Sequence, residues 1–88
     1  MEKKGYIEWI LRWFYEKVTV DTIDIKSNFF TNGLLNSFQT LELVMSIETS
    51  LQISLPDSVL VDSKFSTIDG LAAILSELNH IKNIAHVE

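Results

Sequence analysis

Three stretches of this 88-residue chain repeat apolar residues at the spacing of an α-helix, and no other feature limits the fold more. They run from about Lys4 to Val18, over residues 37–51, and from Ser66 or Thr67 onward, since either residue can cap a helix. Pro56 suits the first turn of a further short helix, over about residues 57–61. With only three glycines and one proline, the sequence has few turn signals and little indication of β structure. We therefore predict an all-α fold, a small four-helix bundle with a short third helix.

The last long helix should bury one stripe, and the tail from Asn83 to Glu88 should fray. The stripe comprises Ile68, Leu71, Ile74, Leu75, Leu78 and Ile81. The segment Thr19–Leu35 lacks sustained periodicity and is predicted to be a long first loop; such loops are often functional. Phe29 and Phe30 are predicted to pin this loop to the core, because two adjacent exposed phenylalanines would reduce solubility.

The first helix adds three aromatic residues, Tyr6, Trp9 and Trp13, to its apolar stripe. We favour the interpretation that they cover the open side of the bundle. The alternative is a helix that rests on a membrane surface, but such helices usually have a polar face rich in lysine and arginine. Here the polar positions include Glu8 and Glu16.

Size and charge narrow the classes of function. We expect one domain over residues 1–88, a monomer, too small for a core together with a deep catalytic cavity. The net charge of −5 opposes binding to nucleic acid and favours basic patches on partner proteins. No signal peptide and no apolar run of about 20 residues is evident, so we expect a cytoplasmic location without membrane insertion.

The second helix has two different faces. One arc is almost wholly apolar and should face the core: Thr40, Leu43, Val44, Ile47 and Leu51. The opposite arc carries Phe38, Leu41 and Met45, interleaved with Glu42 and Glu48. An apolar patch flanked by carboxylates suits transient docking to partner proteins. The alternative is that the first loop folds over this arc and buries it.

Ser37 stands where the loop ends and this helix begins. Serine is a good N-cap residue, but Asn36 is an equally good one, and Gln39 would then complete a capping box. In that arrangement Ser37 is the first helical residue and its hydroxyl is free. A phosphodiester at this position would be stabilised by the amides and dipole of the helix N-terminus.

The sequence Asn-Gly-Leu-Leu-Asn-Ser-Phe over residues 32–38 resembles the attachment site of acyl carrier proteins, most of all the free-standing D-alanyl and peptidyl carrier branch. In that family the serine of an Asp-Ser-(Leu/Met/Phe) triplet carries 4′-phosphopantetheine, whereas here Asn36 replaces the acid. The resemblance extends over roughly residues 29–75. It also includes the segments 41–48, 53–56 and 65–68.

The resemblance implies that a phosphopantetheinyl transferase uses coenzyme A to modify Ser37. The arm would hold acyl or aminoacyl groups as thioesters, loaded by a ligase and passed to downstream biosynthetic enzymes. The docking surface would comprise Asn36, Phe38, Leu41, Glu42, Met45 and Glu48. The Leu34-Leu35 form of the loop favours an aminoacyl or specialised cargo over a fatty acyl chain. Asn36 and Gln39 reduce the negative charge beside the serine, which could restrict loading to a dedicated transferase.

Other chemistry has little support. His80 and His86 lack cysteine partners for a metal site. Glu42 and Glu48, on an open helix, lack the burial that would separate their pKa values for acid–base catalysis. We therefore predict no enzyme and no metal. The alternative function is an unmodified helical adaptor that keeps the carrier fold and uses the second helix for docking.

Overall fold

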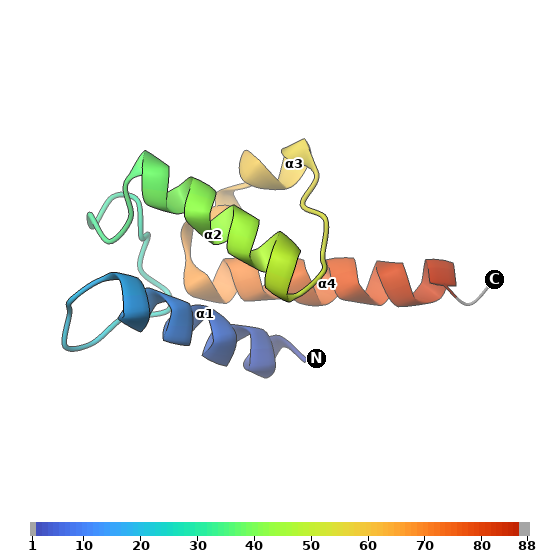
Figure 1. Cartoon of the computed structure of the whole chain (residues 1–88), viewed down its shortest axis with the longest axis horizontal. Helices are drawn as coiled ribbons and strands as arrows, with labels where there is room; N and C mark the ends of the chain where they lie inside the picture. Colours follow the sequence, from blue (N-terminus) through green and yellow to red (C-terminus); the bar gives the residue numbers. More distant parts are fainter. Residues whose placement is uncertain (1, 87–88) are drawn as a thin grey trace.

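The protein is described by a computed structural model that covers residues 2–86, with side chains as far as His80. Its elements are α1 (Lys3–Lys17), α2 (Ser37–Ser50), α3 (Asp57–Leu60), the 3₁₀ helix η1 (Ser63–Ser66) and α4 (Ile68–His86). Helix α1 runs opposite to α2 and α4 (Figure 1). The described residues contain no strand, so the prediction of an all-α bundle is confirmed.

The helix boundaries lie close to the predicted ones, with two differences. The 3₁₀ helix η1 was not predicted, and α4 continues as helix to His86 rather than fraying from Asn83. Residues 87 and 88, to which the fraying prediction also applied, lie outside the described residues. Thr67, one of the two predicted caps, accepts a hydrogen bond at its Oγ1 from the Gly70 N–H at 2.9 Å and so begins α4.

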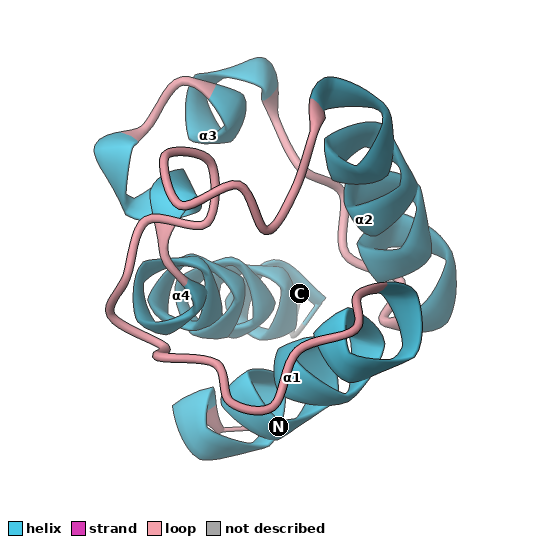
Figure 2. Ribbon diagram, turned by 90° about the vertical axis from the view of Figure 1, so that its left-hand side faces the viewer, coloured by secondary structure: helices cyan, strands magenta, loops and turns pink. Residues whose placement is uncertain are grey.

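One apolar cluster joins all the helices. In a view nearly along α4, α1 lies below it, α2 to its right and α3 above it (Figure 2). Leu43 and Ile47 of α2 are fully buried, as predicted for the core arc. The predicted α4 stripe is also buried at Ile68, Leu71, Ile74 and Leu75, whereas the side chain of Ile81 lies outside the described part.

The aromatic residues of α1 belong to the bundle. Tyr6 and Trp13 are buried, and Trp9 packs partly buried against the core. The Trp13 indole Nε1 donates to the Ser46 hydroxyl at 3.1 Å, which ties α1 to α2. The interpretation as bundle cover is therefore confirmed, and the membrane-surface alternative is wrong because the rings face the protein. Within the described residues, no helix is both long and apolar enough to span a membrane.

The long first loop is confirmed between α1 and α2, and it contains turns but no helix. Its Phe29 N–H donates to the Ser66 carbonyl at 2.8 Å, which attaches the loop to η1. Phe29 is buried as predicted, but the prediction for Phe30 is wrong because 41% of this residue is exposed. The Phe30 ring packs against the rings of Phe29 and Phe65 and still leaves a side open to solvent.

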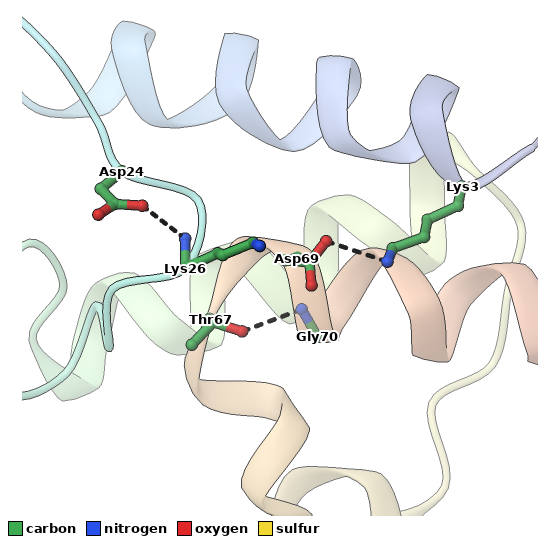
Figure 3. A network of polar contacts seen from close by, with 6 residues as sticks. All are labelled: Lys3, Asp24, Lys26, Thr67, Asp69 and Gly70. Carbon is green, nitrogen blue, oxygen red and sulfur yellow. Dashed lines mark hydrogen bonds and ion pairs between the residues drawn. The ribbon is translucent and has the colours of Figure 1, made fainter.

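Three segments meet at the start of α4 (Figure 3). The Lys3 ammonium of α1 lies 3.0 Å from the Asp69 carboxylate, and the Asp69 N–H donates to the Ile25 carbonyl of the loop at 2.9 Å. Beside them, the Asp24 carboxylate accepts a hydrogen bond from the Lys26 N–H. The Asp69–Ile25 hydrogen bond attaches the middle of the first loop to the start of α4.

Candidate functional site

Ser37 is the first residue of α2, and its neighbour Asn36 caps the helix. The Asn36 Oδ1 accepts from the Gln39 N–H at 2.8 Å, and the Gln39 Oε1 accepts from the Asn36 N–H at 3.1 Å. The predicted capping box is thereby confirmed. Because the box is built from the residues on either side, Ser37 is not needed as a cap.

The Ser37 side chain is exposed, and its hydroxyl makes no hydrogen bond to any described residue. The N–H groups of Ser37 and Phe38 likewise have no acceptor within the described part of the chain. Free amides at a helix N-terminus, together with the helix dipole, stabilise a negative charge placed beside them. The first turn of α2 therefore offers a free hydroxyl, to which an anionic group can be attached, and two N–H donors that would stabilise its charge.

The loop before Ser37 is held by its own hydrogen bonds. The Asn28 Oδ1 accepts from the N–H groups of Phe30 and Thr31 at 2.9 and 3.0 Å. The Leu35 N–H donates to the Phe29 carbonyl at 3.0 Å. Gly33 has a φ of +80°, a value that glycine adopts without strain. Leu35 is then buried directly before the cap, which fixes Ser37 relative to the core.

An open groove of about 600 Å³ lies between this loop and α2. Phe30 and Leu41 provide exposed apolar surface on the two sides, and the buried Leu35 contributes from beneath. Asn36, Ser37 and Thr40 complete its lining. Sequence reasoning missed this groove because it assigned Phe30 to the core and Thr40 to the core-facing arc.

The outer arc of α2 is open to solvent. Phe38 is 72% exposed, Leu41 63% and Met45 66%. The alternative that the first loop covers this arc is therefore wrong. We call these three residues the α2 apolar patch.

The two carboxylates beside the α2 apolar patch also make contacts within the fold. The Glu42 Oε2 lies 3.9 Å from the Lys17 ammonium of α1. The Glu48 Oε2 accepts a hydrogen bond from the Leu55 N–H at 3.0 Å, which holds the segment that leads to α3. The role of Glu48 was missed because Leu55 lies outside the helix, where helical spacing cannot predict a contact.

Elsewhere the described side chains offer little for other chemistry. Among them, no three His, Asp or Glu residues lie close enough together to hold a metal ion. His80 is exposed, and the side chain of His86 lies outside the described part. A second depression, of about 240 Å³, lies between α1 and α2 around Trp9 and Arg12.

Comparison with protein families gives a match over residues 14–75 to the family described as "Phosphopantetheine attachment site". The matched segment begins in α1, includes the first loop and all of α2, and ends inside α4. It spans more than half of the chain. No curated protein matches the sequence.

Proposed function

Because the chain belongs to the family of phosphopantetheine attachment-site domains, we propose that Ser37 is the residue that carries the arm. Domains of this family are sites of covalent 4′-phosphopantetheine attachment, and the chain is accordingly a carrier. Such domains are in general carriers without catalysis of their own. The observation that supports Ser37 most strongly is its exposed, unbonded hydroxyl in the first turn of α2.

Several other serines lie within the matched segment, and some are already engaged. The Ser46 hydroxyl accepts from Trp13, and the Ser66 hydroxyl donates to the Ser63 carbonyl. Ser37 combines exposure with two free amides, its own and that of Phe38. A phosphodiester is an anion, so the helix N-terminus favours it at this position over a serine in mid-helix.

In the proposed reaction, a phosphopantetheinyl transferase brings coenzyme A to this turn. The Ser37 Oγ forms a bond to phosphorus, the pyrophosphate linkage of coenzyme A breaks, and adenosine 3′,5′-bisphosphate leaves as the serine loses its proton. Once attached, the arm supplies a terminal thiol that holds acyl or aminoacyl groups as thioesters. The chain contributes a fixed attachment point, because the capping box and the buried Leu35 hold the turn in place.

We further propose that partners dock on α2 beside the serine. The α2 apolar patch offers contact area, and Met45 can adapt its shape to different surfaces. Asn36, Glu42 and Glu48 would orient a basic partner, although both glutamates also bind within the fold. The partners would be the transferase, a loading ligase and downstream enzymes, met in the cytoplasm by a monomeric carrier. We favour an aminoacyl or specialised cargo on the Leu34-Leu35 sequence alone.

The test is an intact mass after incubation with coenzyme A and a broad-specificity phosphopantetheinyl transferase. The parent should gain one phosphopantetheinyl group, and Ser37→Ala should gain none. Ser50→Ala is the matched control, because Ser50 is another exposed serine of the same helix, and it should be loaded like the parent. Loading of Ser37→Ala would overturn the assignment.

A folded parent that one transferase leaves unmodified is compatible with a dedicated transferase or with the adaptor. Failure of several transferases to load it would favour the adaptor function, provided that its helical circular dichroism shows it to be folded. In an adaptor, Ser37→Ala would leave partner binding unchanged, whereas in a carrier the same variant would lose all transfer.

A further inference from the structure

We propose that the groove between the first loop and α2 holds the part of the arm nearest to Ser37, through contacts with Phe30 and Leu41. The inference rests on the proposed function, since the occupant is the phosphopantetheine attached to that serine. The groove starts at the attachment residue itself, because Ser37 is one of its lining residues.

Phe30 forms one side of the groove, and its ring packs against two other aromatic rings. Its ring centroid lies 4.7 Å from that of Phe29 at 61°, and 6.4 Å from that of Phe65 in a stacked arrangement. Phe29 and Phe65 are buried, so the Phe30 ring packs against two fixed neighbours. Phe30 is thus a residue that is 41% exposed but whose ring is held by aromatic contacts.

The loop that contains Phe30 does not have to reorganise to bind the arm. Asn28 accepts the N–H groups of Phe30 and Thr31, and the Leu35 N–H closes the loop on the Phe29 carbonyl. The conformational cost of binding is lower when the receiving surface is already ordered. A weak contact with a tethered group can then be populated, because the tether keeps the local concentration high.

The chemistry of the lining matches the near part of the arm. Two bonds from the phosphate oxygen, the arm has a carbon with two methyl groups, and the amides follow farther on. Phe30 and Leu41 present apolar surface, and Leu35 is buried beneath. The Thr40 hydroxyl, on the polar side, already donates to the Asn36 carbonyl at 2.9 Å. An apolar branched group close to Ser37 suits this lining better than the amide and thiol portions do.

It follows that the branched part of the arm is ordered, whereas the part with the thiol remains mobile beyond the groove. The lining would then orient the arm at its base and leave the cargo free to reach a partner. Leu41 would serve two roles, because it lines the groove and belongs to the α2 apolar patch.

The test uses ¹³C-labelled protein carrying an unlabelled arm, loaded to completion with excess transferase and verified by mass. Isotope-filtered nuclear Overhauser spectra should show contacts from the arm's two methyl groups to the Phe30 ring and the Leu41 methyls. Phe30→Ala should lose most of this intensity and narrow the arm's methyl signals. Phe38→Ala is the matched control, because Phe38 is an exposed phenylalanine of α2 that does not line the groove, and it should keep the contacts.

Leu41→Ser is a second variant, for the case that Phe30→Ala does not fold, and it should weaken the contacts from the opposite wall. A fully loaded parent whose arm methyl groups contact neither Phe30 nor Leu41 would contradict binding of the arm in the groove. The carrier function would not be affected. Equal loss of contacts in Phe38→Ala would also contradict binding of the arm in the groove. A folded parent that several transferases all fail to load would instead overturn the carrier function, and this inference with it.

Discussion

At Asn36, an amide takes the place of the acid found in the carrier proteins that this chain resembles. The residue still caps α2, since its Oδ1 accepts from the Gln39 N–H. Stability and recognition can therefore be separated at this position. The cap needs only an oxygen acceptor, whereas a transferase that reads the surface would detect the missing charge.

We predict that Asn36→Ala lowers the free energy of unfolding by about 1 kcal/mol, because the first turn of α2 loses its side-chain acceptor. Asn36→Asp should keep the parent's stability and be loaded at least as fast, because it restores the family's acid. Urea unfolding and the rate of loading at Ser37 measure the two effects. Slower loading of Asn36→Asp would mean that the transferase for this chain selects the amide.

Burial raises the pKa of the Tyr6 phenol above its usual value of 10.0. In the unfolded chain this tyrosine loses its proton at a lower pH than in the folded protein. Above about pH 10, the folded state thus holds more protons, and the free energy of unfolding falls as the pH rises through the folded pKa.

We predict that Tyr6→Phe is less sensitive to alkali than the parent. The difference between their free energies of unfolding should change by at most about 1.4 kcal/mol per pH unit above about pH 10, and stay constant at neutral pH. Urea titrations at several pH values measure it. Parallel curves across this range would show that Tyr6 ionises equally in both states.

At the scale of elements, local patterns predicted most of the fold. The helical spacing of apolar residues predicted α1, α2 and α4. The Asn36–Gln39 capping box predicted that α2 begins at Ser37. What escaped prediction depends on contacts between distant segments. The exposure of Phe30 follows from how the loop packs against Phe65, and the Glu48 bond to Leu55 follows from how the chain turns toward α3. No periodicity encodes such contacts.

The first turn of α4 packs unusually close to η1. A Cβ at Gly70 would overlap the Lys64 carbonyl oxygen and lie 2.9 Å from the Thr67 Oγ1. Replacing an ordinary glycine inside a helix with alanine raises the free energy of unfolding by about 1 kcal/mol.

We predict the opposite sign here, with Gly70→Ala lowering the free energy of unfolding by about 1–3 kcal/mol because η1 must move. Urea unfolding measures the sign directly. A stabilised Gly70→Ala protein would show that the contact between η1 and α4 relaxes without cost.

At the scale of the whole molecule, the described side chains include two groups of exposed apolar residues at helices, besides Tyr15, Val20 and Phe30. One is the α2 apolar patch, and the other is Leu60 and Val61 at the end of α3. Exposure alone does not separate them, since Val61 is 87% exposed. The α2 apolar patch differs by its place beside Ser37 and by the carboxylates around it, in a chain with a net charge of −5. These differences support the proposal that partners dock on α2.

We predict that Met45→Ala raises the transferase KM about fivefold, which corresponds to about 1 kcal/mol of binding. Val61→Ala, the matched control, should leave the KM unchanged. Both variants should stay within about 0.5 kcal/mol of the parent's stability, because both side chains are exposed. An equal rise in KM for Val61→Ala would extend the docking surface over α3.

The most direct test of the carrier function is to locate the modified residue. Trypsin should release residues 27–64 as one peptide, because no lysine or arginine lies between Lys26 and Lys64. This peptide contains several serines besides Ser37. Fragmentation of the peptide from transferase-treated protein should place the entire added mass on the residue between Asn36 and Phe38. An adduct on any other serine, or a folded protein that gains no adduct from several transferases, would contradict the assignment of Ser37.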